Sequence, residues 1–100
     1  MNTLSSILKF IGNRFNRIQG GYLSGQNVGA NSYLDRQITF PNSYSSAPAV
    51  AVTLSSTSEA GEMGQVMAAA INVTTTGFTV RVFNAGTATR TPALHWIAIP

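Results

Sequence analysis

The 100 residues of the chain, 44% of them hydrophobic and only 9% charged, are enough for one small globular domain with its own core. The formal net charge of +3 lies in residues 1–20, because the arginines and acids of residues 21–100 cancel, whereas nucleic-acid-binding domains carry basic charge on their folded body. The chain has no cysteine for disulfides or thiolate metal sites, and no apolar run of the ~20 residues that span a membrane. We therefore expect neither nucleic-acid binding nor membrane insertion.

The first predicted element is a helix over residues 3–18, which we expect Gly20-Gly21 to terminate. Its apolar residues alternate in spacings of four and three, which is the seam of a coiled coil. A helix this short is unstable alone in water, so it must pack on copies of itself, on its own domain or on a membrane surface. The 3.5-residue period favours self-association, and we predict a trimeric coiled coil over residues 1–20, ahead of a domain over residues 21–100. The seam consists of Leu4, Leu8, Ile11, Phe15 and Ile18.

Short alternating apolar runs, separated by clusters of Gly, Pro, Asn and Ser, predict six strands in the rest of the chain. The clearest pair flanks Thr74-Thr-Thr-Gly77, a predicted hairpin turn in which we expect Gly77 to take a positive φ. Tyr44 lies in a loop of small polar residues, and we expect its ring to point inward. Six short strands at this spacing predict an antiparallel β-sandwich. The predicted strands are residues 22–27, 35–40, 49–55, 65–73, 77–84 and 93–99.

Several predicted strands are apolar on both faces, namely residues 66–73, 78–83 and 94–99. One face of each can line the core of the sandwich, but a domain of this size has nothing to cover the other. In addition, no lysine follows Lys9, although lysine commonly protects exposed sheet edges. Both features predict a homo-oligomer whose neighbouring subunits cover the second faces.

The chain offers few groups for catalysis. His95 is the only histidine and lies in an apolar strand, so a structural or interface role is favoured over that of a general base. Glu59 and Glu62 lie in a polar loop, where two solvated carboxylates are a simpler interpretation than a glycosidase pair. No phosphate-binding loop, dinucleotide motif, nucleophile elbow or zinc spacing occurs. We therefore expect no enzyme, no metal and no cofactor.

Loop amides, an arginine and an aromatic ring are the groups best suited to binding a ligand. Carbohydrate sites use planar hydrogen-bonding side chains against sugar hydroxyls, often with a ring under the apolar face of the sugar. The same residue types are also ordinary formers of turns and loops, so composition alone leaves both interpretations open. The candidate carbohydrate-binding residues are Asn27, Asn31, Tyr33, Gln65, Asn84 and Arg90.

Four segments within residues 20–100 resemble the H-type lectin domain of snail agglutinins and of the C-terminal part of discoidins. They are Ile38–Phe40, Pro48–Val50, Asn72–Phe78 and Trp96–Ile99, and the last two are the sharpest matches. The resemblance implies a six-stranded antiparallel sandwich that trimerises side by side. It also implies binding of N-acetylgalactosamine or galactose in clefts between subunits.

The sugar-binding positions of that family carry over in part. The loop in which snail lectins have a sugar-binding acidic residue corresponds to residues 27–32, which offer amides instead. The family's arginine from a neighbouring subunit corresponds to the region of Gln65, and its aromatic-histidine pair corresponds to Asn84-Ala85. Arg90 lies where the family can place an aromatic residue. The resemblance thus implies a glycan cleft whose contacts differ from those of the snail lectins.

The predicted helix, followed by a small head rich in Ser, Thr and Asn, also resembles the distal tip of a bacteriophage or prophage tail fibre. This resemblance implies a homotrimeric receptor-binding head that attaches to a cell-surface glycan, on the virion or otherwise extracellular. The alternative is a purely structural trimeric knob that binds no ligand. Glycan binding by the intact oligomer would separate the two.

Overall fold

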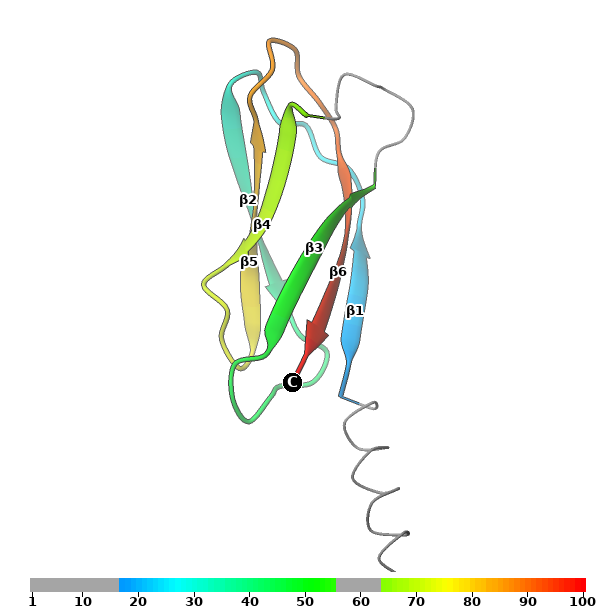
Figure 1. The fold of residues 1–100 in the computed structure, drawn as a ribbon, viewed down its shortest axis with the longest axis vertical. Coiled ribbons are helices and arrows are strands. Elements are labelled where there is room, and N and C mark those ends of the chain that lie inside the picture. Colours follow the sequence, from blue (N-terminus) through cyan, green and yellow to red (C-terminus); the bar gives the residue numbers. More distant parts are fainter. Residues whose placement is uncertain (1–16, 56–63) are drawn as a thin grey trace, which may run out of the picture.

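The computed structural model describes residues 17–55 and 64–100, which form two three-stranded antiparallel sheets packed face to face (Figure 1). The first sheet has the strand order β1-β6-β3 and the second has the order β2-β5-β4. The prediction of a mainly β, six-stranded antiparallel sandwich is therefore confirmed. The strands are β1 (Gln19–Leu23), β2 (Ser32–Thr39), β3 (Ala49–Ser55), β4 (Val66–Ile71), β5 (Gly77–Asn84) and β6 (Ala93–Ile99).

The predicted N-terminal helix lies outside the described residues, and so do four of its five seam residues, Leu4, Leu8, Ile11 and Phe15. The fifth, Ile18, is exposed just before β1. The trimeric coiled coil therefore stays a prediction.

The core lies between the sheets and is built mainly from alternate residues of the two central strands, β5 and β6. Alternation along a strand sends every second side chain to the same face, so each strand contributes one continuous apolar row. The rings of Phe40, Phe78 and Trp96 pack at centroid distances of 5.4 to 5.8 Å. Tyr44 meets Phe40 edge-on at 5.1 Å and is buried, as expected. The two central strands supply Phe78, Val80, Val82, Leu94, Trp96 and Ala98 to this core.

The prediction that Gly20-Gly21 ends a helix is wrong, because both glycines lie in β1 and pair with β6. Gly21 is opposite Trp96, and a Cβ atom on Gly21 would lie only 2.5 Å from the indole Nε1. Glycine is needed here because the strand lies directly against the indole ring. Since β1 begins at Gln19, the predicted boundary between residues 20 and 21 falls inside the first strand of the sandwich.

The turn between β4 and β5 forms the predicted hairpin, but the expectation of a positive φ at Gly77 is wrong. Asn72 takes the left-handed conformation, with a φ of 52°, a region that Asn tolerates better than most residues. The Thr74 Oγ1 atom accepts hydrogen bonds from the N–H groups of Thr76 and Gly77 at 3.3 and 3.2 Å, which closes the turn. Gly77 instead packs against the carbonyl oxygen of Ile38, where no Cβ atom would fit.

Both outer faces of the sandwich carry exposed apolar side chains, as the strands with two apolar faces led us to expect. His95 lies on one of these faces, with its ring centroid 5.0 Å from that of Tyr22. Cover of these faces by neighbouring subunits stays a prediction, and exposed apolar area of this kind is typical of interaction surfaces. The large residues concerned are Tyr22, Ile97 and Ile99 on the sheet β1-β6-β3, and Tyr33 and Met67 on the sheet β2-β5-β4.

Candidate functional site

Three loops meet at one end of the sandwich (Figure 1). They are residues 24–31 between β1 and β2, residues 64–65 before β4, and residues 85–92 between β5 and β6. Backbone hydrogen bonds join these loops directly, so their relative positions depend little on side chains. We call the three loops together the loop platform. The bonded pairs are Val28 with Arg90 (two bonds, 2.7 and 3.0 Å), Asn31 with Gly86 (3.0 Å), and Ala85 with Gln65 (2.8 Å).

Asn84 lies in the middle of the loop platform and is completely buried. Its Nδ2 donates hydrogen bonds to Val28 O at 3.0 Å and to Ala88 O at 2.8 Å, and its Oδ1 accepts one from Gly86 N–H at 2.9 Å. Asn84 was predicted as a ligand contact, but this burial leaves it no surface to offer a ligand. It acts instead as the internal support of two loops. The sequence held a signal for this, since Asn84 continues the inward-facing alternation of Val80 and Val82.

Four of the other predicted residues, Asn27, Asn31, Gln65 and Arg90, belong to the loop platform. Asn27 Oδ1 accepts a hydrogen bond from Thr91 Oγ1 at 2.9 Å, which fixes one side of the amide. Asn31 is exposed, with a φ of 51°. Arg90 is half-buried and donates from Nη2 to Gln65 Oε1 at 3.5 Å. Amide and guanidinium groups from three loops are therefore gathered at one end of the molecule.

Tyr33, the sixth predicted residue, lies outside the loop platform, on the outer face of β2. Its ring lies 4.4 Å from the guanidinium carbon of Arg81, which also donates two hydrogen bonds, of 2.8 and 2.9 Å, to the carboxylate of Asp35. These bonds hold the pKa of Asp35 below its ordinary value and the pKa of Arg81 above its own. Sequence reasoning missed this cluster. Alternation places all three residues on outward positions, but their contact depends on the register that sets Asp35 opposite Arg81.

Residues 35–99 match the model of the H-type lectin domain. The chain belongs to the H-type lectin domain family. The match begins within β2 and runs to the end of β6, so it includes the two central strands and the loop between them. The resemblance found in the sequence is therefore confirmed.

Solved structures share the fold of this H-type lectin domain. The tailspike protein gp49 of Pseudomonas phage LKA1 is 30% identical, with a TM-score of 0.66 over 81% of this chain and 14% of the tailspike. An N-truncated R1-type pyocin tail fibre is 21% identical, with a TM-score of 0.67 over 83% of this chain and 69% of that one. Recombinant discoidin II of Dictyostelium discoideum is 21% identical, with a TM-score of 0.68 over 82% of this chain and 36% of that one. The chain thus spans a small part of the tailspike and about a third of discoidin II; no curated protein matches it.

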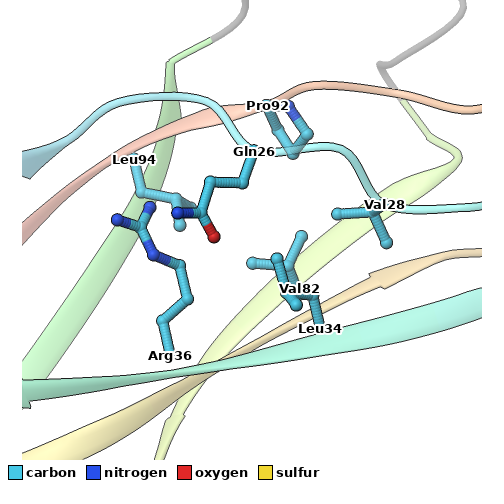
Figure 2. Close-up of a pocket in the computed structure, with 7 residues that line it drawn as sticks. All are labelled: Gln26, Val28, Leu34, Arg36, Val82, Pro92 and Leu94. Carbon is cyan, nitrogen blue, oxygen red and sulfur yellow. The ribbon is translucent and has the colours of Figure 1, made fainter.

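A mainly apolar pocket lies where the loop platform meets the edges of the two sheets (Figure 2). Arg36 is on the inward face of β2 and donates from Nη1 to Ser24 O at 2.9 Å. Figure 2 shows Gln26 and Arg36 on one side of this pocket and Val28, Leu34 and Val82 on the other. The side chains leave essentially no free volume, ≈ 0 Å³, so in this arrangement the pocket has no room for a ligand.

Residues 17–55 and 64–100 show neither of two further kinds of functional feature. These residues contain no group of three or more side chains suited to holding a metal ion. They also contain no helix with the length and hydropathy needed to cross a membrane.

Proposed function

We propose that the chain is the carbohydrate-binding head of a homotrimeric tail-fibre-type protein, and that it attaches to a glycan on a cell surface. The observation that carries this proposal is the loop platform, in which backbone hydrogen bonds and the side chain of Asn84 hold three loops together. Membership of the H-type lectin family and the likeness to a phage tailspike support the same function. The proposed location is accordingly the virion or the extracellular space.

Binding in this proposal rests on hydrogen bonds and involves no catalytic step, metal or cofactor. The Nδ2 group of Asn27 faces no partner among the described residues, because only its Oδ1 is bonded to Thr91. The amides of Asn31 and Gln65 and the guanidinium of Arg90 add planar donors that match pairs of sugar hydroxyls. Each such site is weak alone, and three copies on one trimer raise the overall affinity through multivalency.

The trimer of this proposal is supported by the exposed apolar residues on the outer faces. Tyr33 and Met67 are each more than half exposed on the sheet β2-β5-β4, although both are large. A neighbouring subunit covering such residues removes apolar area from water, which stabilises association at about 25 cal/mol for each Å² buried.

A glycan array probed with the intact oligomer tests the proposal, with Asn31→Gly as the main variant. Glycine keeps the positive φ of this position and removes only the amide, so the loop should retain its shape. We expect selective glycan binding by the wild type and a several-fold loss with Asn31→Gly. The matched control is Asn72→Gly, because Asn72 has a φ of 52° and lies at the opposite end of the sandwich.

The array result also separates the proposal from a purely structural knob. Equal loss with Asn31→Gly and Asn72→Gly would count against the loop platform as the site. If the intact oligomer bound no glycan, including polysaccharides of host cell surfaces, the structural knob would be the better account. Light scattering on each variant checks that the oligomeric state is unchanged.

A further inference from the structure

A cavity of ≈ 220 Å³ opens at the opposite end of the sandwich from the loop platform. It lies where the chain enters β1 and where the loop between β2 and β3 turns, at the lower end of the molecule in Figure 1. Ligand sites for drug-sized molecules have roughly 300–1,000 Å³, so a cavity of this volume suits a single sugar unit or a similar small polar molecule. Its lining residues are Arg17, Gln19, Asn42, Ser43, Tyr44 and Ser45.

The wall of this cavity is fixed by side chains that are already bonded. Gln19 clamps the backbone of Asn42, since its Nε2 donates to Asn42 O at 2.8 Å and its Oε1 accepts from Asn42 N–H at 2.9 Å. Tyr44 is anchored in the core through Phe40, and its hydroxyl donates to Arg17 O at 2.5 Å. These two anchors hold the loop from β2 to β3 against the start of β1, so the cavity exists without a ligand.

The remaining polar groups of the wall are available to a ligand. The side chains of Arg17, Asn42, Ser43 and Ser45 have no hydrogen bond or ion pair with any of the residues that the structure describes. All but Arg17 are neutral, and no residue of the wall is acidic. Guanidinium groups bind carboxylates and phosphates through two parallel N–H bonds, and the amide and hydroxyls can donate to or accept from sugar hydroxyls.

We propose that this cavity is a second ligand site, which binds one acidic sugar unit, with Arg17 pairing with its anionic group. The anion can be a carboxylate, as in a uronic acid, or a phosphate, as in a sugar phosphate, because both offer oxygens to the same guanidinium fork. Asn42, Ser43 and Ser45 bind the hydroxyls of the same unit, and Gln19 and Tyr44 are positioning residues. The site is separate from the loop platform and requires no contact between subunits.

Nuclear magnetic resonance titration of the intact chain with glucuronate, glucose 1-phosphate and glucose tests the site. We expect both acidic probes to shift the backbone signals of residues 42–45 in a saturable way, with millimolar affinity that weakens as salt is added. Glucose should bind at least about tenfold more weakly, since it lacks the charge-assisted bonds to Arg17. If glucuronate binds more tightly, the anionic group of the natural ligand is a carboxylate. If glucose 1-phosphate binds more tightly, it is a phosphate.

Three variants sharpen this test. Arg17→Gln should weaken both acidic probes by about tenfold or more and leave the fold intact, because Arg17 is exposed and supports Tyr44 only through its backbone. Arg17→Lys should retain part of the affinity, since lysine keeps the positive charge but lacks the two parallel N–H donors of the guanidinium group. Thr89→Ala, an exposed change on the loop platform, should alter nothing at residues 42–45.

Two outcomes would overturn the second site. One is equal affinity for glucuronate and glucose, and the other is wild-type affinity for both acidic probes in Arg17→Gln. Failure of every acidic probe to saturate the shifts would overturn it as well. None of these outcomes bears on the glycan binding proposed for the loop platform, which is tested separately by Asn31→Gly on the glycan array.

Discussion

Replacement of Asn84 by aspartate isolates the hydrogen bonds that hold the loop platform together, because the two side chains have almost the same shape. Asn84→Asp replaces the Nδ2 group, which donates to Val28 O and Ala88 O, by one oxygen that faces both carbonyl oxygens. The bond to Val28 is buried and the bond to Ala88 partly so, and a buried acceptor left without a donor costs about 1–3 kcal/mol. We expect the free energy of unfolding to fall by about 3 kcal/mol at neutral pH.

The cost of Asn84→Asp should also depend on pH, in a direction that follows from burial. The completely buried position and the two carbonyl oxygens disfavour a carboxylate, so the pKa of the introduced carboxyl is raised in the folded state. A carboxyl whose pKa is higher in the folded state than in the unfolded state lowers the free energy of unfolding least at pH values below its unfolded-state pKa. The loss of stability grows as the pH rises through the folded-state pKa. The difference from wild type should therefore be clearly smaller at pH 4 than at pH 8.

Urea denaturation followed by circular dichroism, at both pH values and one protein concentration, measures this difference. The control is Asn72→Asp, an exposed turn position at the other end of the sandwich, which should cost less than about 0.5 kcal/mol at either pH. A cost for Asn84→Asp below about 1 kcal/mol, or the same cost at pH 4 and pH 8, would refute the role assigned to Asn84.

Three further predictions follow from other parts of the chain. Gly21→Ala should lower stability by about 1–3 kcal/mol in thermal denaturation, because its Cβ would lie 2.5 Å from the indole nitrogen of Trp96, and wild-type stability would contradict that packing. Because the pKa of Asp35 is lowered in the folded state, its ion pair stabilises the protein at pH values above the unfolded-state pKa, and this stability is lost as the pH falls through the folded-state pKa. Asp35→Asn should therefore make stability depend less on pH in the acid range. An unchanged acid side would contradict the ion pair. Deletion of residues 1–16 should weaken the oligomer in analytical ultracentrifugation, and an intact chain that is monomeric at every concentration would rule out the trimer.

Strand prediction succeeded where local signals and tertiary structure agree. The bounds of β3 and β6 were predicted correctly, since each strand follows a proline, Pro48 or Pro92, and then alternates regularly. The start of β2 was placed three residues late, because Asn31 and Ser32 look like a loop in the sequence. Ser32 belongs to the strand only through its pairing with Asn84, a contact between distant segments that a local pattern does not contain.

The six candidate site residues lie at different kinds of position in the structure, and their role in binding stays a prediction. The sequence placed these amides and the arginine on loops but did not place them relative to one another, and the structure brings Asn27, Asn31, Gln65 and Arg90 together at one end of the sandwich. Whether a loop residue faces outward depends on the path of the loop, which composition does not determine. The cavity beside Tyr44 could not be predicted from the sequence for the same reason, because its wall joins the start of β1 to a loop more than 20 residues away in the chain.

The way in which the loop platform is held explains how this chain can depart from the sugar contacts of its family without losing the fold. Its loops are joined by backbone bonds, between Val28 and Arg90 and between Asn31 and Gly86, which any non-proline residue can make. The side chain of Asn84 joins two of the loops from inside, and the Asn27–Thr91 and Arg90–Gln65 side-chain bonds add to the joint nearer the surface. The exposed amide of Asn31 takes no part in these bonds, so it can change without loss of the joint, whereas the position that the family gives to its aromatic-histidine pair holds the buried Asn84 here. We therefore expect Asn84→Asp to lower the stability of the loop platform, and Asn31→Gly to leave that stability unchanged while it weakens the glycan binding proposed here.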